Sequence, residues 1–162
     1  MEPSAKLAAA QSQLNLVLGF FGRVDTKLSV VLGINLALLG VLSTKILSTE
    51  KISMPSLIAA GVFVILVTLS FVQLYRGSFP TLEGGHASIV FFREIQKKSE
   101  SEFIKAYRET TAEALAEDYL GQAWRNSKIL TMKFDRLKSS YVLMAWAILP
   151  WAFTIISLAR FK

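Results

Sequence analysis

Long uncharged stretches dominate the pattern of polar and apolar positions along the chain. They cover residues 28–44, 52–75 and 139–159. A helix needs about 20 residues to cross the hydrocarbon core of a bilayer. The second and third stretches meet this requirement, and the first is at its lower limit. Lys27 and Lys45, which flank the first stretch, can extend their ammonium groups to the two membrane interfaces.

The pattern predicts an all-α membrane protein with three transmembrane helices, over residues 28–46, 55–75 and 141–159. The hydrophobic content of 52% agrees with this class. The alternative, three buried helices in the core of a soluble domain, fits stretches of this length less well. Most of the remaining residues form an N-terminal segment, 1–27, and a middle segment, 76–140, and the others form a short loop at 47–54 and the C-terminal tail.

Residues 1–27 read as an N-terminal amphipathic helix. Polar residues at 11, 12, 13 and 15 break the apolar run that a cleavable signal peptide would need. On a helical wheel the apolar residues of this segment share one face: Leu7, Ala10, Leu14, Val17, Leu18 and Phe21. This helix is expected to lie on the membrane surface or to pack on the middle segment.

Asn35 interrupts the first apolar stretch near its middle, where an unpaired amide costs free energy. Small residues gather in one arc on nearly the opposite side of the same helix: Ser29, Gly33, Ala37, Gly40 and Thr44. Such a stripe permits close approach of another helix. We predict that Asn35 faces a helix of another subunit, at an oligomer interface. The alternative is an amide bonded to a local backbone carbonyl.

The middle segment is expected to be a helical domain. A loop over 77–85 (GSFPTLEGG) leaves the second span. ASIVFF, at 87–92, fits a strand, an interfacial anchor or a packed linker. Ser99 with Glu102 forms a capping-box pattern that opens a short helix through about Arg108, and Thr110 with Glu113 suggests a second box.

The helix that begins near Thr111 is expected to continue through the third span, to about Ala159. Its apolar positions repeat with alternating spacings of four and three: Ala123, Ser127, Leu130, Phe134, Leu137, Tyr141, Met144 and Ile148. Pro150 should kink this helix without ending it. A rod of about 70 Å would result. Such a rod suits a device that passes a soluble signal into the membrane, although long helices are also common in purely helical domains.

Charge predicts the orientation in the membrane. Eleven Lys and Arg residues lie between residues 76 and 138, and three lie before residue 28. The loop over 47–54 has only Lys51, and the C-terminal tail has Arg160 and Lys162. By the positive-inside rule the N-terminus and the middle domain are cytoplasmic, and the short loop and C-terminus face outward.

The candidate chemistry is binding, not catalysis. The chain has no cysteine and one histidine, His86, so we expect neither a metal site nor a cofactor. Phosphate-loop and dinucleotide motifs are absent from the sequence, and the balanced charge of the middle domain argues against nucleic acid. Cations and an aromatic residue that together suit a nucleotide occur at Arg93, Lys97, Arg108, Trp124, Arg125 and Lys128. A solvated surface of mixed charge is the alternative.

The order of segments resembles the transmembrane effectors of Pycsar anti-phage systems. It runs from VDTK into LSVVLGINLALLG, through a second span and SIVFF, to KILTMKFDRLKSSYVLMAWAIL, and the likeness covers about residues 22–145. The matching positions are Asp25, Lys27 and Asn35 in the first-span signature, Ser88 to Phe92, and Lys133, Phe134, Leu137 and Tyr141 before the last span. GGHA, at 84–87, departs from the basic residues expected there.

The resemblance implies a membrane effector in the bacterial inner membrane. Such an effector binds a cyclic pyrimidine mononucleotide (cUMP or cCMP) in its cytoplasmic domain, oligomerises as a homo-oligomer in contact with membrane lipid, and impairs membrane integrity. It is not an enzyme. The alternative function is a constitutive membrane scaffold or accessory subunit whose helical domain binds a protein partner.

Overall fold

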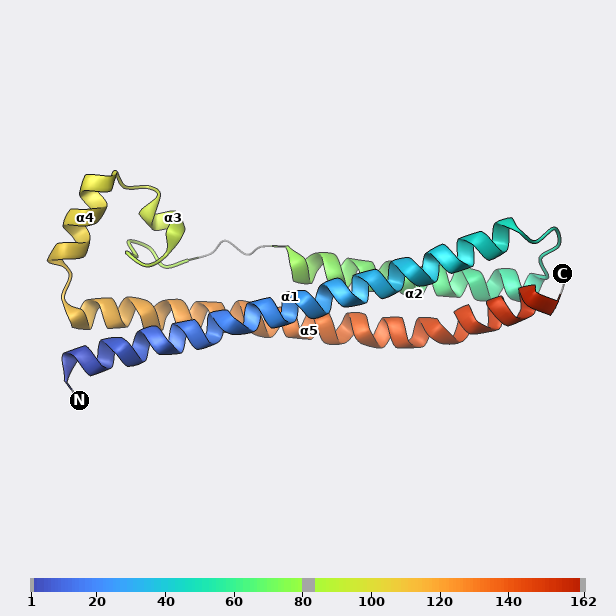
Figure 1. The fold of residues 1–162 in the computed structure, drawn as a ribbon, viewed down its shortest axis with the longest axis horizontal. Helices are drawn as coiled ribbons and strands as arrows, with labels where there is room; N and C mark the ends of the chain where they lie inside the picture. The colour runs from blue at the N-terminus through green and yellow to red at the C-terminus, as the bar shows by residue number, and fades with distance from the viewer. Residues whose placement is uncertain (1, 80–83, 161–162) are drawn as a thin grey trace. The chain divides into compact units, whose positions relative to one another are not determined.

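A computed structural model describes residues 2–79 and 84–160. Within these ranges the regular structure is helical and contains no strand. The helices are α1 (Pro3–Leu47), α2 (Met54–Ser78), α3 (Phe92–Ile95), α4 (Glu100–Glu109) and α5 (Ala112–Arg160) (Figure 1). The predicted all-α class is therefore confirmed for the described residues. Lys162 and part of the loop expected at 77–85 lie outside them.

Three of the helices are long and apolar enough to cross a membrane: α1, α2 and α5. The number of spans agrees with the prediction. The amphipathic segment 1–27 and the first span are parts of one continuous helix, α1, with no break between them. The third predicted span continues from the middle segment without a break, and α5 runs through Pro150 as expected.

The chain divides into two compact units. Unit 1 consists of residues 1–23 and 80–132, and unit 2 of residues 24–79 and 133–162. α1 and α5 each contribute residues to both units. Unit 2 contains most of the apolar surface, whereas most of the charged middle segment belongs to unit 1.

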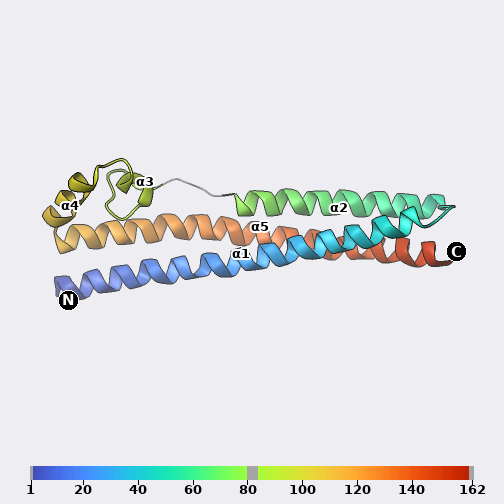
Figure 2. The same cartoon turned by 45° about the horizontal axis from the view of Figure 1, so that its top comes forward.

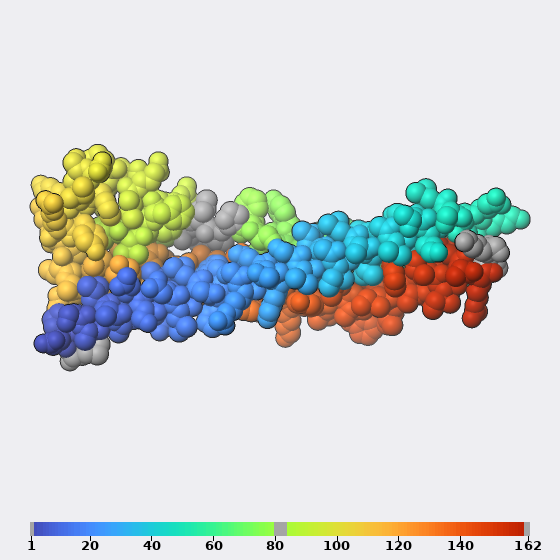
Figure 3. Space-filling view, viewed as in Figure 1, coloured from blue at the N-terminus to red at the C-terminus, as the bar shows by residue number. Residues whose placement is uncertain are grey.

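Unit 2 is a three-helix bundle in which α1 and α5 run parallel and α2 runs antiparallel to both. Asp25 contacts Lys133 and Leu38 contacts Trp151, so positions on α1 and α5 increase together. On α2 the order is reversed, because Ser70 contacts Ser140 whereas Ser56 contacts Ser157. Figures 1 and 2 show the three helices side by side, and Figure 3 shows α1 and α5 in contact along one face.

Inward positions in the bundle repeat with spacings of three and four. On α2 the buried residues are Ser56, Ala60, Phe63, Val67, Ser70, Leu74 and Gly77. An apolar cluster of buried residues joins the three helices: Leu42, Ala60, Phe63, Val67 and Ala147. This spacing is typical of coiled-coil packing, in which inward residues are separated alternately by three and four residues, so that the pattern repeats every seven residues.

The predicted seam on α5 is right at some positions and wrong at others. Leu137 and Met144 are buried, as expected. Phe134, Tyr141 and Ile148 are exposed, and the residues that precede them are buried instead: Lys133, Ser140 and Ala147. Helices in a membrane place small and polar residues against one another and large apolar residues toward lipid. The seam therefore lies one residue earlier at these three levels.

Asn35 faces the inside of its own chain, which contradicts the prediction of a contact with another subunit. Its side chain has 0% exposed area. Its amide Nδ2 donates to Ser70 Oγ at 2.9 Å, across from α1 to α2. The buried amide finds its partner on the neighbouring helix because unit 2 packs the Asn35 face of α1 inward. The small-residue stripe on α1, from Ser29 to Thr44, is exposed in the single chain.

Unit 1 places the first part of α1 beside the first part of α5. Ala10, Leu14 and Val17, on the predicted apolar face, are buried, whereas Leu18 is exposed. One cavity is lined by α1 and α5 residues together: Lys6, Ala9, Ala10, Gln13, Glu113, Ala116, Glu117 and Leu120. The apolar face thus packs against the middle segment, which was one of the two expected arrangements.

The predicted caps are confirmed for α4 and corrected for α5. Ser99 and Glu102 form the reciprocal capping box at the start of α4. Thr110 does not open a box, because its hydroxyl donates to the Ala106 carbonyl at 2.7 Å. Thr111 caps the N-terminus of α5 instead, and its hydroxyl accepts a hydrogen bond from the Ala114 amide at 3.2 Å. Thr110 is the C-cap of α4, so the next helix is capped one residue later, by Thr111.

Candidate functional site

Unit 1 contains a non-helical segment, residues 84–91, that is held against α5 by Asp118. The Asp118 carboxylate accepts from the Ser88 hydroxyl at 2.8 Å and from the Ile89 and Val90 amides at 2.9 and 3.2 Å. Three donors converge on one carboxylate, which fixes the backbone of the segment. Of the three structures considered for ASIVFF, the packed linker is the one observed.

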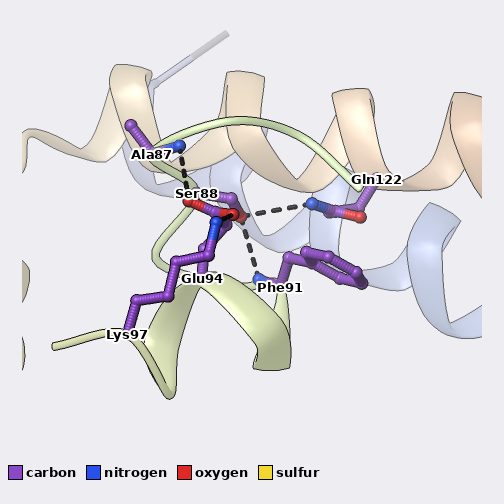
Figure 4. Close-up of polar contacts among 6 residues, drawn as sticks. All are labelled: Ala87, Ser88, Phe91, Glu94, Lys97 and Gln122. Carbon is purple, nitrogen blue, oxygen red and sulfur yellow. Dashed lines mark hydrogen bonds and ion pairs between the residues drawn. The ribbon is translucent and has the colours of Figure 1, made fainter. Parts of the chain in front are cut away.

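Ser88 is the centre of this arrangement and is buried. Its hydroxyl oxygen accepts from the Val90 and Phe91 amides at 3.1 and 2.9 Å, which starts the turn into α3. The Gln122 side-chain amide on α5 also donates to it, at 3.2 Å (Figure 4). The segment 84–91, called the linker below, is therefore attached to α5 at two positions that are one helical turn apart, Asp118 and Gln122.

Ala87, which precedes this turn, has a φ of 59°. This left-handed conformation costs an alanine about 1–2 kcal/mol. The Ala87 amide donates to Glu94 Oε2 at 3.1 Å, and Glu94 also pairs with Lys97 (Figure 4). The hydrogen bond from Lys97, followed by that from Ala87, holds the pKa of Glu94 below its ordinary value. Glu94 thus stabilises a strained turn beside α3.

A cavity of about 500 Å³ opens beside the turn. Its lining combines cationic, polar and aromatic side chains with a glycine: Gly84, His86, Phe91, Arg93, Glu94, Gln96 and Lys97. Arg93 and Lys97 supply two positive charges, Glu94 supplies one negative charge that pairs with Lys97, and Phe91 supplies an aromatic ring. Such a combination suits an anion that carries a planar ring, because cations bind the anionic group and an aromatic face stacks on the ring.

Two glycines of the linker allow close approach of large side chains. A Cβ at Gly84 would collide with the Phe91 ring, and one at Gly85 with the Arg125 guanidinium. Gly121, on α5, also faces Arg125, whose Nη2 would lie 3.1 Å from an added Cβ. The GG pair in GGHA, which departs from the expected basic residues, therefore makes room for Phe91 and Arg125.

Arg125 has a buried Nε atom without a hydrogen-bond partner. A buried guanidinium normally pairs with a carboxylate or another acceptor. Its position against Gly85, which adjoins Gly84 of the cavity lining, makes Arg125 a candidate donor for an anionic ligand.

The predicted ligand residues do not form a single cluster. Arg93 and Lys97 line the 500 Å³ cavity, whereas Arg108 lines a different one, with Ser101, Ile104, Lys105 and Glu109. Trp124 is 60% exposed, and the Lys128 ammonium lies 3.8 Å from the centroid of its ring. The Trp124 ring is thus already covered on one side by a cation of the same helix.

Sequence reasoning missed Asp118, Gln122 and His86. Asp118 and Gln122 are four residues apart on α5 and so lie on the same face. That spacing was visible, but nothing in the sequence indicated that this face binds the SIVFF segment. His86 was considered only as a catalytic or metal-binding residue.

Unit 2 brings two parts of the family-like signature together. Lys133 Nζ lies 2.6 Å from Asp25 Oδ1, which joins the first-span signature to the segment before the last span. Lys27, the other charged residue of the signature, is exposed. Asp25 therefore has a structural partner, which sequence alone did not identify.

The sequence of residues 9–159 matches the family described as the Pycsar effector protein domain. This match covers most of the chain. The chain belongs to the Pycsar effector family. Membership agrees with the resemblance in its segments, and it supports a role in anti-phage defence and a location in a membrane.

Among curated proteins, the chain is similar to the "Pycsar effector protein GmPycTM" of Gulbenkiania mobilis. The two are 37% identical over 81 residues, which is 45% of this chain and 41% of the relative. The alignment thus spans about two fifths of that Pycsar effector's length. No solved structure matches this chain.

Proposed function

We propose that this Pycsar effector binds a cyclic pyrimidine mononucleotide, cUMP or cCMP, in unit 1 and then impairs the integrity of the bacterial inner membrane. It acts by binding and not by catalysis. The observation that carries the proposal is the cavity of about 500 Å³, in which two cations and an aromatic ring line one space. Membership of the Pycsar effector family supports the immune role and a cyclic nucleotide as the ligand.

In this proposal different residues of the cavity bind different parts of the nucleotide. Arg93 and Lys97 neutralise the cyclic phosphate, and Phe91 stacks on the pyrimidine ring. Gln96 can both donate and accept hydrogen bonds, as the edge of a pyrimidine requires. The Arg125 guanidinium, which lies beside Gly85, moves toward the ligand and donates a hydrogen bond to its phosphate.

Binding is expected to act on the linker that carries the cavity. A bound phosphate would compete with Glu94 for the Lys97 ammonium group. Glu94 also accepts a hydrogen bond from the Ala87 amide. A phosphate that attracts Lys97 weakens one of the two contacts of Glu94. The change reaches α5 through Ser88, which is bonded to both Asp118 and Gln122. α5 is one continuous helix that also contributes a span to unit 2.

The orientation follows from charge. The many Lys and Arg residues of the middle segment favour a cytoplasmic location for unit 1, where a nucleotide messenger would be found. The connection between α1 and α2, near Lys51, then faces outward.

Oligomerisation uses the exposed small-residue stripe of α1 in this proposal. Gly33 and Gly40 have nothing within 4 Å of an added Cβ, so their side of α1 is open in the single chain. Small residues let a helix of a second copy approach closely in lipid. This face replaces Asn35 as the candidate interface.

Isothermal titration of the detergent-purified protein with cUMP and cCMP tests the receptor function. Arg93→Ala and Lys97→Ala should each weaken binding at least tenfold, since a charge-assisted hydrogen bond contributes about 1.5–3 kcal/mol. Arg108→Ala and Trp124→Ala serve as comparisons, because Arg108 lines another cavity and Trp124 faces Lys128. Equal losses in all four variants would contradict the cavity as the site. An absence of binding to either nucleotide would favour the scaffold function.

A further inference from the structure

Each helix of unit 2 contributes one buried polar side chain to a layer in the bundle interior. These are Asn35 on α1, Ser70 on α2 and Ser140 on α5, each with 0% exposed area. Asn35 lies near the middle of the first apolar stretch, where polar groups are costly unless they are paired. The layer therefore needs a full set of hydrogen bonds.

The polar side chains of this layer cannot all find hydrogen-bond partners within the protein. Asn35 Nδ2 donates to Ser70 Oγ at 2.9 Å, Ser70 Oγ donates to the Ser140 carbonyl at 3.2 Å, and Ser140 Oγ donates to the Leu137 carbonyl at 2.8 Å. Both hydroxyl protons are thus in use, and Asn35 Oδ1 is buried without a partner.

Rotating the amide does not remove the deficit. With Oδ1 and Nδ2 exchanged, Ser70 would donate to Asn35, and the Ser140 carbonyl would lose the Ser70 hydroxyl. The amide nitrogen would then lack the acceptor that Ser70 provides. In either orientation one polar atom of the Asn35 side chain has no partner within the protein, and a bound water molecule would supply one. Water is the smallest molecule that both donates and accepts.

Further polar groups lie at both ends of the same interior. At one end Ser56 Oγ donates to Ser157 Oγ at 2.6 Å, and Thr154 is buried one helical turn away from Ser157. At the other end Lys133 pairs with Asp25, and the Arg136 guanidinium donates to Gln73 Oε1 at 3.0 Å. Polar groups are thus present at the two ends and in the middle.

Apolar levels separate the polar ones. Phe63, with 0% exposed area, belongs to the cluster of Leu42, Ala60, Val67 and Ala147, between Ser70 and the Ser56 end of α2. Leu74 on α2 and Leu137 on α5 are buried between the Ser70 level and the Lys133 end. Apolar constrictions of this kind exclude water from a polar path until they widen.

We propose that the Asn35, Ser70 and Ser140 layer is a hydrated site, and that it is the midpoint of a path for water and small ions through the interior of each subunit. Phe63 closes this path. Ions cross when the bundle loosens at the Phe63 level, and the polar groups replace part of their hydration.

Cysteine labelling tests the hydration of the layer, because the chain has no cysteine of its own. Ser70→Cys changes only oxygen to sulfur, so the bundle should still fold. In a chain that also carries Phe63→Ala, which opens the path, a small charged methanethiosulfonate reagent should label Ser70→Cys at least tenfold faster than Val72→Cys, which is exposed on the outer face of α2. Equal rates at the two positions would show a dry layer and overturn the proposal.

Release of potassium from liposomes tests the closure by Phe63. Phe63→Ala should raise the leak at least tenfold without any nucleotide, and Asn35→Leu in the same chain should reverse the increase. Phe153→Ala is the matched control, because Phe153 is an exposed phenylalanine on α5. An equal leak in Phe63→Ala and Phe153→Ala would contradict the path. Both measurements omit nucleotide, so they stand or fall separately from the proposed receptor function.

Discussion

Lys133 on α5 donates a hydrogen bond of 2.6 Å to Asp25 on α1, although 108 positions separate the two residues in the sequence. Their side chains differ in environment, since that of Lys133 is 7% exposed and that of Asp25 is 51% exposed. Removing the carboxylate leaves a buried ammonium group without this acceptor, whereas removing the ammonium leaves a carboxylate that water can hydrate. The pair is therefore asymmetric in its sensitivity to substitution.

Asp25→Asn should lower the free energy of unfolding by about 1–2 kcal/mol, a value reduced for solvent screening of the exposed carboxylate. Lys133→Met should have a smaller effect, because methionine fills a similar volume without a buried charge. Thermal unfolding in detergent measures both, with Asp135→Asn, an exposed position on α5, as the control. A larger loss in Lys133→Met than in Asp25→Asn would contradict the asymmetry.

Ala87→Gly should stabilise unit 1. Glycine adopts a φ of 59° without the steric cost that alanine has, and the gain, after the larger chain entropy of glycine, should reach at most about 1 kcal/mol. Ala106→Gly, within α4, should instead destabilise by about 1 kcal/mol. Denaturant unfolding of the two variants should give opposite signs, and a destabilised Ala87→Gly would show that the turn is not strained.

Acidification should loosen the turn between Ala87 and α3. The pKa of Glu94 is lowered from 4.5, so its contribution to stability is present above that value and is lost as the pH falls through the lowered pKa. Hydrogen exchange at the Ala87 amide should therefore lose protection below about pH 4.5, after correction for the intrinsic pH dependence of exchange. Glu94→Gln should remove this transition. A transition that persists in the variant would have to be assigned to another group.

Gly33→Leu should reduce self-association in detergent, because the leucine side chain would prevent close approach along the small-residue stripe of α1. Gly61→Leu on α2 is the matched control, since an added Cβ there also meets nothing within 4 Å. Cross-linking of the two variants, with and without cUMP or cCMP, measures the oligomer distribution. If Gly61→Leu disrupts the oligomer and Gly33→Leu does not, the interface lies on α2.

Asn35→Leu should change the stability of the bundle more than the oligomer. The substitution removes the donor to Ser70 and also removes Oδ1, which has no partner within the protein, so the two effects oppose each other. The net change should be within about 1 kcal/mol, in line with hydrogen bonds between membrane helices. Ser70→Ala, which leaves the Asn35 amide unpaired, should be the more destabilising of the two in thermal unfolding.

The sequence predicted the apolar helices and the capped helix α4 because length and capping residues are local signals. The inward register of α5 was wrong at Phe134, Tyr141 and Ile148 for a different reason. Large apolar residues face the core of a soluble helix but the lipid around a membrane helix, so the solvent must be known before a seam can be assigned. Asn35 was given an external partner for a similar reason, since Ser70 on α2 could not be paired with it from the sequence.

The candidate site could be predicted only in part. Of the six residues predicted to bind the ligand, Arg93 and Lys97 line one cavity, as their spacing of four residues allows. Their association with Phe91 and His86 depends on the turn at Ala87, and no sequence rule places an alanine in a left-handed conformation. The role of Asp118 depends on three donors that follow one another in the linker, which become visible only when the linker lies on α5.

The interior of unit 2 repeats like a soluble coiled coil while its outer face carries residues such as Val62, Ile65, Trp146 and Leu149. The contacts that hold the three helices together thus do not depend on the outer residues. Replacing outward residues by Glu, Lys and Gln should yield a water-soluble analogue with the same interior. Such an analogue would allow the bundle to be studied by solution NMR without lipid or detergent.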